Sequence, residues 1–260
     1  MDAVIHLAGI ANDPCGELDA KLTWEVNVLA TLRLAEACVA AGVRRFIFAS
    51  SASVYGIQGN AAVTEDAPLE PVSDYNKTKM TAERVLRSYA DGLKLCIVRP
   101  ATVCGMSPRM RLDTVVNMLT VQALEKGRIT AHCGAHGAVL MRPNTHIEDI
   151  TDLYVRLVKK PWICDTFNAG FENLTVGDTA AIIKKIVPCE VDLTEVADKR
   201  SYSVDSSKLL AAFQDDGFAP RRGVADAVRD IAEAWDAGKL RMAERCVNLA
   251  WMRKNGWVAG

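Results

Sequence analysis

The segment Phe46–Gly56 has the sequence FIFASSASVYG, and it decides the fold. Its first four residues form an uninterrupted apolar run, which is typical of a strand buried in a parallel sheet. Ser50 and Ser51 follow at the point where this strand ends, and Gly56 suits the turn after it. The segment therefore predicts a buried strand that ends in a hydroxyl-bearing turn.

A helix is predicted downstream of this turn, from Tyr75 to about Ala90. Tyr75 and Lys79 are four residues apart, so they lie on one face of that helix. We expect the ammonium group to lower the pKa of the phenol from its ordinary value near ~10. Tyr75 can then remove a proton from an alcohol while Ser51 holds the alcohol oxygen. The alternative is an ordinary surface pair, and the serine-rich turn upstream favours the chemical interpretation.

Strands and helices alternate along the chain on both sides of this stretch. The alternation predicts parallel βαβ units in a doubly wound α/β sheet. The expected elements include the strand Ala3–Ala8, the helix Leu18–Ala41, the strand that begins at Phe46, the helix that begins at Tyr75, the strand Leu93–Val98, a helix from His146 to about Lys159 and a helix capped by Thr175 that runs to Ile186.

The composition excludes several classes of function. The 260 residues carry 31 Lys and Arg against 32 Asp and Glu, so we expect neither nucleic acid nor a membrane as a partner. No apolar run reaches the ~18 residues of a membrane span and no signal peptide opens the sequence, so we expect a cytoplasmic protein. The eight dispersed cysteines lack a Cys-x-x-Cys pair and are expected to be reduced and mostly buried.

One cluster of residues, His132, Cys133 and His136, suggests a metal ligand set. Gly134 and Gly137 interleave with these residues and indicate a tight turn between two short strands instead. We therefore expect no metal site.

The serine-rich turn together with Tyr75 and Lys79 resembles the extended short-chain dehydrogenase/reductase family, in its NAD-dependent epimerase/dehydratase branch. The resemblance covers nearly the whole chain. It implies NAD as cofactor, a nucleotide sugar as substrate, and an incomplete doubly wound Rossmann sheet with a smaller C-terminal substrate domain. Residues 1–106 and 143–170 would form the NAD-binding part, and residues 107–142 and 171–260 the substrate-binding part. A homodimer stays open as the oligomeric state.

The resemblance also assigns roles to individual residues. Ser51, Tyr75 and Lys79 match the family's catalytic residues, and Lys79 would also hold the nicotinamide ribose. The residues expected to contact the cofactor are Leu7, Ala8, Gly9, Asn27, Tyr75, Lys79 and Ala101. The residues expected to contact the substrate are Ser51, Thr102, Arg142 and Arg200.

Three positions depart from the family pattern. Ala30 replaces a glycine, Thr102 replaces a substrate-binding asparagine, and Cys104 replaces a tyrosine. Arg142 stands where the family places an arginine on the nucleotide diphosphate, and a guanidinium fork suits that group. The alternative for Arg142 is an exposed loop arginine, and Arg200 is the weaker of the two diphosphate candidates.

The residues after Ser51 favour one reaction class. Dehydratases of the family carry Asp and Glu there to eliminate water, whereas this chain has Ala52 and Ser53. We therefore expect an epimerase similar to UDP-glucose 4-epimerase, which oxidises a sugar carbon transiently. A sugar or ketone reductase with the same residues stays open, as does a catalytically silent remnant of the family.

A glycine-rich turn is missing from the sequence. Dinucleotide-binding sheets use such a turn to bring backbone to the pyrophosphate, and neither Gly-x-Gly-x-x-Gly nor Gly-x-x-Gly-x-x-Gly occurs here. The strand Ala3–Ala8 also lacks the charges, prolines or bulges that protect a sheet edge. We therefore expect that this chain lacks an N-terminal part of about sixty residues, at ~30 per βαβ unit.

Overall fold

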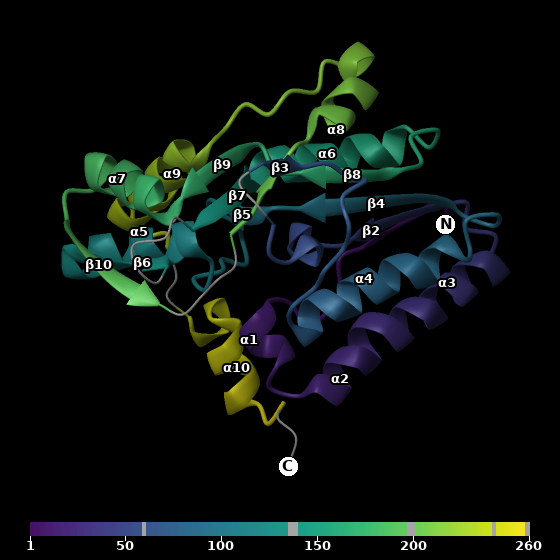
Figure 1. The fold of residues 1–260 in the computed structure, drawn as a ribbon, viewed down its shortest axis with the longest axis horizontal. Coiled ribbons are helices and arrows are strands. Elements are labelled where there is room, and N and C mark those ends of the chain that lie inside the picture. The colour runs from purple at the N-terminus through teal and green to yellow at the C-terminus, as the bar shows by residue number, and fades with distance from the viewer. Residues whose placement is uncertain (59–60, 135–139, 197–200, 241–242, 258–260) are drawn as a thin grey trace.

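A computed structural model describes residues 1–58, 61–134, 140–196, 201–240 and 243–257. Its central feature is a parallel four-stranded sheet in the order β1-β2-β4-β8 (Figure 1). The predicted α/β class with a parallel sheet is confirmed. The strands are β1 (Ala3–His6), β2 (Arg45–Ala49), β4 (Lys94–Pro100) and β8 (Thr166–Ala169).

Alternate residues of β2 explain why helices cover both faces of this sheet. Phe46 and Phe48 are buried in one hydrophobic cluster with residues of α3 (Ala30–Ala40) and α4 (Asp74–Arg87). Ile47 lies between them in sequence and is buried in a second cluster with residues of α6 (Ile147–Lys159) and α8 (Ser207–Ala212). Successive side chains of a strand point to opposite faces, so an all-apolar strand is the one that suits a sheet covered on both sides.

The edge strand β1 is only partly covered. Ile5 is 38% exposed and Leu7, just after the strand, is 58% exposed. The cluster that takes in Ile47 includes no residue of β1, so the face of the sheet that carries Ile5 stays open.

The helix expected over residues 18–41 forms as three consecutive segments. These are α2 (Ala20–Trp24), a π-helical turn (Glu25–Leu29) and α3. Asp19 caps the first segment, since its side chain accepts a hydrogen bond from the amide of Leu22 at 2.9 Å. π-Helical turns frequently occur at functional sites, and this one contains Asn27.

The second half of the chain builds smaller sheets around a separate core. That core contains residues of α5 (Val115–Lys126), α7 (Val176–Ile186) and α9 (Val224–Asp236). Thr175 caps α7 with a reciprocal capping box to Asp178, as its position predicted. The strands pair as β5 (Thr102–Cys104), β7 (Met141–His146) and β9 (Glu172–Thr175) in one sheet, β6 (Arg128–Gly134) with β10 (Glu190–Val196), and β3 (Ala62–Val63) with β11 (Ser203–Val204).

β6 and β7 flank the predicted glycine turn, and they lie in different sheets. β6 pairs in parallel with β10, whereas β7 pairs with β5 and β9. The turn itself, with Gly137 and the candidate metal ligand His136, falls in residues 135–139 and so lies outside the described residues.

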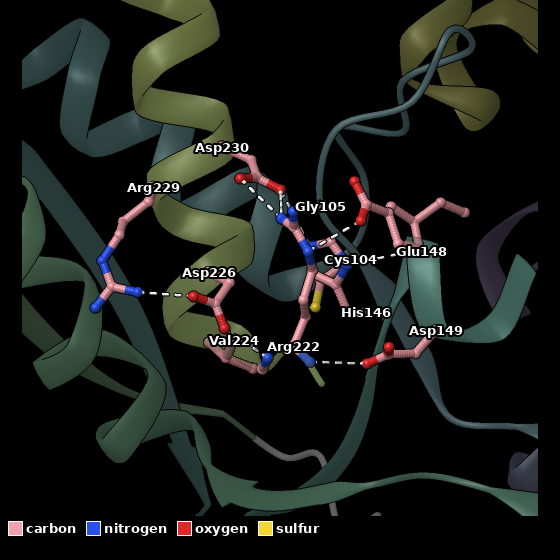
Figure 2. Close-up of polar contacts among 12 residues, drawn as sticks. Cys104, Gly105, His146, Glu148, Asp149, Arg222, Val224, Asp226, Arg229 and Asp230 are labelled. Atoms are coloured by element: carbon pink, nitrogen blue, oxygen red, sulfur yellow. Dashed lines mark hydrogen bonds and ion pairs between the residues drawn. The ribbon is translucent and has the colours of Figure 1, made fainter. Parts of the chain in front are cut away.

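Ion pairs and hydrogen bonds among charged side chains join α9 to the junction of β7 and α6 (Figure 2). The buried carboxylate of Asp149 accepts hydrogen bonds from the backbone amides of Arg221 and Arg222. The Arg222 guanidinium in turn pairs with Glu148 at 2.9 Å and with Asp230 at 3.0 Å. His146 caps α6, accepting a hydrogen bond from the amide of Glu148 at Nδ1. This cluster fixes α9 and the segment before it against the first turn of α6.

The C-terminal tail returns to the N-terminal region. Helix α10 (Asn248–Lys254) buries Met252 against Ile10 and against Cys15 of the short helix α1 (Asp13–Gly16) (Figure 1). None of the eight cysteines, all of which lie in the described residues, is in a disulfide, and five of them are buried, which confirms that they are mostly buried. Among the described residues, no helix has both the length and the apolar character that a bilayer crossing requires.

Candidate active site

Ser51 and Tyr75 are brought together by the turn after β2 and the first turn of α4. Ser51 opens a 3-10 turn over Ala52–Tyr55, and Tyr75 follows the first residue of α4. The Ser51 hydroxyl lies close enough to the Tyr75 phenol to lower its pKa. The structure therefore places two of the three predicted catalytic residues against each other.

Two further polar residues join this pair, and the sequence analysis missed both. The Ser51 hydroxyl lies 2.7 Å from the Ser53 hydroxyl, which donates to the side-chain oxygen of the buried Asn76. Asn76 directly follows Tyr75, and Ser53 occupies a position at which the family's dehydratases carry a carboxylate. These two places in the sequence, next to Tyr75 and in the dehydratase pattern, could have identified Asn76 and Ser53 as site residues.

The pKa of Tyr75 lies above its ordinary value in this structure. Burial, which disfavours the phenolate, is the largest cause, and the hydrogen bond from Ser51 and the positive charge of Arg111 offset it only in part. The expectation that Lys79 lowers this pKa is wrong for the chain without its cofactor. Among the described residues, no hydrogen bond or ion pair joins Tyr75 to Lys79.

Lys79 points toward the end of β2. Its Nζ atom donates a hydrogen bond to the carbonyl of Ala49 at 2.8 Å and lies 5.0 Å from the ring centroid of Phe48. Burial lowers the pKa of Lys79 from 10.5 to about 8, although the nearby Glu83 carboxylate acts in the opposite direction. An ammonium group carries three donors, so Lys79 retains hydrogens for a ligand.

The residues that follow β1 are exposed, and Gly9 among them lies beside Lys79. Leu7, Ala8 and Gly9 are all exposed. A Cβ atom on Gly9 would lie 2.9 Å from the side-chain oxygen of Asn27 and 3.7 Å from Lys79 Nζ. Bare backbone next to a buried ammonium group fits a nucleotide cofactor such as NAD. The glycine turn that would receive the pyrophosphate is not in the sequence.

Asn27 uses its side chain within the protein. Its amide oxygen accepts from the backbone of Ile10 at 2.8 Å, and its amide nitrogen donates to the Ile10 carbonyl and to the Thr78 hydroxyl, each at 3.0 Å. Asn27 is buried, so it holds the loop after β1 against the helix that carries Lys79. Its effect on a cofactor would act through that loop.

The remaining substrate and cofactor candidates lie at the ends of β4, β5 and β7. Ala101 is buried, and its amide donates to the Ala169 carbonyl at 3.0 Å. Thr102 is half-buried on β5 opposite Asn144 of β7, two residues along from Arg142. Arg200 lies outside the described residues.

Arg142 lines a cavity of about 250 Å³ between α5, β6, β7 and α7. Its walls are mostly apolar, and Thr130 and His132 are the other polar residues that line it. Ligand sites commonly combine apolar walls with a few polar groups that fix the orientation of the ligand. The apolar lining residues are Val115, Met118, Leu119, Leu140, Val176 and Val196.

Comparison with known proteins identifies the family. The profile of the NAD dependent epimerase/dehydratase family matches residues 1–170. This chain belongs to that family. Its members are enzymes and their cofactor is NAD, as the sequence predicted.

Two relatives within this family are UDP-glucose epimerases by name. The UDP-glucose 4-epimerase of Lactobacillus helveticus is 28% identical over 258 residues, which cover 90% of this chain and 76% of that protein. An uncharacterised UDP-glucose epimerase of Bacillus subtilis (strain 168) is 32% identical over 198 residues, which cover 72% of this chain and 58% of that protein.

A solved family structure has the same fold. The UDP-glucuronic acid 4-epimerase of Bacillus cereus, in complex with UDP-glucuronic acid and NAD, superimposes with a TM-score of 0.77. It is 27% identical, and the match covers 90% of this chain and 76% of that one.

Proposed function

We propose that this chain is a nucleotide-sugar 4-epimerase that uses NAD, with Ser51, Tyr75 and Lys79 as its catalytic residues. The observation that carries the proposal is the proximity of Ser51 to Tyr75, together with Lys79 of the same helix beside the exposed Gly9 at the end of β1. The similar UDP-glucose 4-epimerases support the reaction class.

Each of the three residues has a distinct task in this proposal. Ser51 donates to the oxygen of the sugar hydroxyl that reacts, and Tyr75 takes the proton of that hydroxyl at its phenolic oxygen. Lys79 binds the nicotinamide ribose with the hydrogens that it does not donate to Ala49. NAD would supply the hydride chemistry at the sugar carbon, removal from one face and return to the other.

The proton transfer needs positive charge near Tyr75, because burial raises the pKa of the phenol. Arg111 contributes such a charge, and Asp13 opposes it. Ser53 and Asn76 hold the Ser51 hydroxyl in place from the other side. Ser53 and Asn76 therefore position the Ser51 hydroxyl, and Arg111 and Asp13 influence the pKa of Tyr75 in opposite directions.

The cavity at Arg142 is the proposed site for the nucleotide. The guanidinium group supplies the charge for a diphosphate, and the apolar walls suit a base. We also propose the division into parts 1–106 with 143–170, and 107–142 with 171–260. Its support is that all four strands of the main sheet fall in the first part. Helix α8 is an exception, since it belongs to the second part and packs on that sheet.

The test is the interconversion of UDP-glucose and UDP-galactose by residues 1–260 with saturating NAD. Tyr75→Phe removes the proton acceptor and is expected to lower kcat by about 100-fold or more. Tyr89→Phe is the matched control, because its hydroxyl contacts only the exposed Glu36 among the described residues. Undiminished kcat in the Tyr75→Phe variant would remove this tyrosine from the mechanism. Failure of the wild-type chain to epimerise either sugar nucleotide would overturn the proposed function.

A further inference from the structure

The C-terminal segment of residues 243–254 runs from the core around α9 to the helix α1. It begins with the 3-10 turn Glu244–Cys246, whose last residue is buried in one hydrophobic cluster with residues of α5 and α9. It ends in α10, which buries Met252 against α1 and the loop before it. Figure 1 shows α10 beside α1. We call residues 243–254 the strap.

The strap is hydrogen-bonded to the loop between β5 and α5. The amide of Leu112 donates to the Cys246 carbonyl at 2.8 Å, and the amide of Asn248 donates to the Asp113 carboxylate at 3.2 Å. The guanidinium group of Arg109 donates to the side-chain oxygen of Asn248 at 2.8 Å. Two of these three bonds use Asn248, which makes it the main polar link between the strap and the loop.

Both segments that the strap contacts adjoin Tyr75. A Cβ atom on Gly16 of α1 would lie 2.9 Å from the Cβ of Tyr75, so the backbone of α1 lies directly against this residue. Asp13 of α1 accepts a hydrogen bond at 2.5 Å from Ser73, which caps the helix of Tyr75. On the other side, the positive charge of Arg111 lowers the pKa of the Tyr75 phenol. We call α1 with its preceding loop, and the loop between β5 and α5, the two walls of the catalytic site.

The two walls also meet directly, at Asn12. Its side-chain nitrogen donates to Asp113 at 3.0 Å, and its side-chain oxygen accepts from the amide of Cys15 at 3.0 Å. The backbone of Asn12 has a φ of +76° and a ψ of 159°, a conformation that residues with a side chain rarely adopt. Such a conformation persists only where the surrounding structure enforces it. The strap contributes to that enforcement, because it binds the same carboxylate of Asp113.

The strap depends on docking for its own structure. Helix α10 spans the seven residues Asn248–Lys254, and isolated helices of this length are not stable in water. Within it Met252 is buried, at 8% exposure, whereas Trp251 and Arg253 on either side are exposed. The strap is therefore either docked and helical or released and unfolded, and Met252 is its apolar anchor.

We propose that the strap fastens the two walls of the catalytic site, so that Tyr75 is positioned for proton transfer only while the strap is docked. Asn248 is a positioning residue in this mechanism, since it links the strap to the loop and has no contact with Tyr75 itself among the described residues. The effect on catalysis rests on the proposed function. The hold of the strap on the walls does not.

The test of that hold is hydrogen exchange of the full chain, resolved for single amides by NMR. The amides of Cys15, Gly16 and Gly105 are hydrogen-bonded inside the walls and not to the strap. Met252→Glu places a charge in the apolar contact and should raise their exchange rates about tenfold or more. Arg253→Glu is the matched control, because it introduces the same side chain at the exposed neighbouring position, and it should leave these rates unchanged.

Asn248→Pro tests the effect on catalysis. Proline removes both the amide and the side-chain oxygen of Asn248, and it is tolerated at the first residue of a helix. It should lower kcat for the interconversion of UDP-glucose and UDP-galactose about tenfold or more, with the affinity for UDP unchanged. Asn248→Ser, which keeps the amide, should recover most of the lost kcat.

The outcomes separate this inference from the proposed function. Faster exchange in the strap alone, with the wall amides still protected in Met252→Glu, would make the strap a passive tail and overturn the inference. Undiminished kcat in Asn248→Pro would overturn it as well. A wild-type chain that epimerises neither sugar nucleotide, but whose wall amides respond to Met252→Glu, would overturn the proposed function and leave the hold of the strap on the walls supported. If Met252→Glu does not fold, Asn248→Pro serves for the exchange measurement with the same expectation.

Discussion

Glu83 and Arg99 form a buried, bidentate ion pair. Arg99 donates from Nε to Oε1 at 2.9 Å and from Nη2 to Oε2 at 2.7 Å, and the two side chains are 2% and 3% exposed. Glu83 lies on α4, one helical turn beyond Lys79, and Arg99 lies on β4. The pair therefore fixes the helix that carries Tyr75 and Lys79 to the main sheet.

We expect Glu83→Ala to lower the free energy of unfolding by about 3–5 kcal/mol, because it leaves the Arg99 charge buried without its partner. Ser50 and Arg99 would both lose an acceptor. Urea denaturation followed by circular dichroism measures the change. The double variant Glu83→Gln with Arg99→Met is the control, since it leaves no unpaired charge and should lose much less. A loss as large in the double variant as in the single one would contradict this account.

Burial of Lys79 predicts a pH-dependent stability. Its pKa is about 8 in the folded chain against 10.5 as the ordinary value. Between these two values the unfolded chain binds more protons than the folded chain, so the contribution of Lys79 to stability rises with pH across this window. Below pH 8 the full cost of burying the charge is present, and above pH 10.5 it is absent.

Lys79→Met removes this titration. The free energy of unfolding of the variant relative to wild type should therefore fall by about 3 kcal/mol between pH 7 and pH 10.5, given ~1.4 kcal/mol per pKa unit. Denaturant melts at several pH values measure it. Lys77→Met is the matched control, because Lys77 is exposed on the same helix, and its difference from wild type should stay flat. A pH-independent difference for Lys79→Met would show that Lys79 titrates normally.

Gly56, in the turn after Ser51, has a backbone conformation and a close neighbour that leave little room for any other residue. Its φ is +71° with ψ at −128°, a region that glycine alone occupies readily, and a Cβ there would lie 1.9 Å from the carbonyl oxygen of Glu70. Gly56→Ala should cost about 3 kcal/mol or more from strain and overlap together. Gly42→Ala is the comparison, since Gly42 also has a positive φ, +68°, but no atom within 4 Å of the new Cβ. Thermal melts of both variants decide the point, and equal losses would exclude the overlap with Glu70.

Arg142→Ala tests the proposed nucleotide cavity. If the guanidinium group binds the diphosphate, its removal should weaken the binding of UDP by about 2–5 kcal/mol. Titration calorimetry with UDP measures this directly and requires no turnover. Unchanged affinity would make Arg142 an ordinary loop arginine, and the nucleotide-sugar proposal would lose one of its supports.

Local patterns predicted the elements of the fold well because each depends on neighbours in sequence. The apolar run at Phe46 specified a strand, and Thr175 and His146 lie at the predicted helix starts. The orientation of Lys79 could not be predicted in this way. Its helical spacing from Tyr75 fixes a shared face, but the choice between the phenol and the Ala49 carbonyl depends on a strand thirty residues away.

The amino-acid sequence alone predicted the α/β class, because hydrophobic period and turn chemistry are properties of short segments. The resemblance carried by the serine-rich turn, Tyr75 and Lys79 indicated the family. Only the tertiary structure decided which charges surround Tyr75. Arg111, Asp113, Asn12 and Asn248 come from three distant segments, and only packing brings them together. Burial, which no local pattern specifies, then raises the pKa of Tyr75 and lowers that of Lys79.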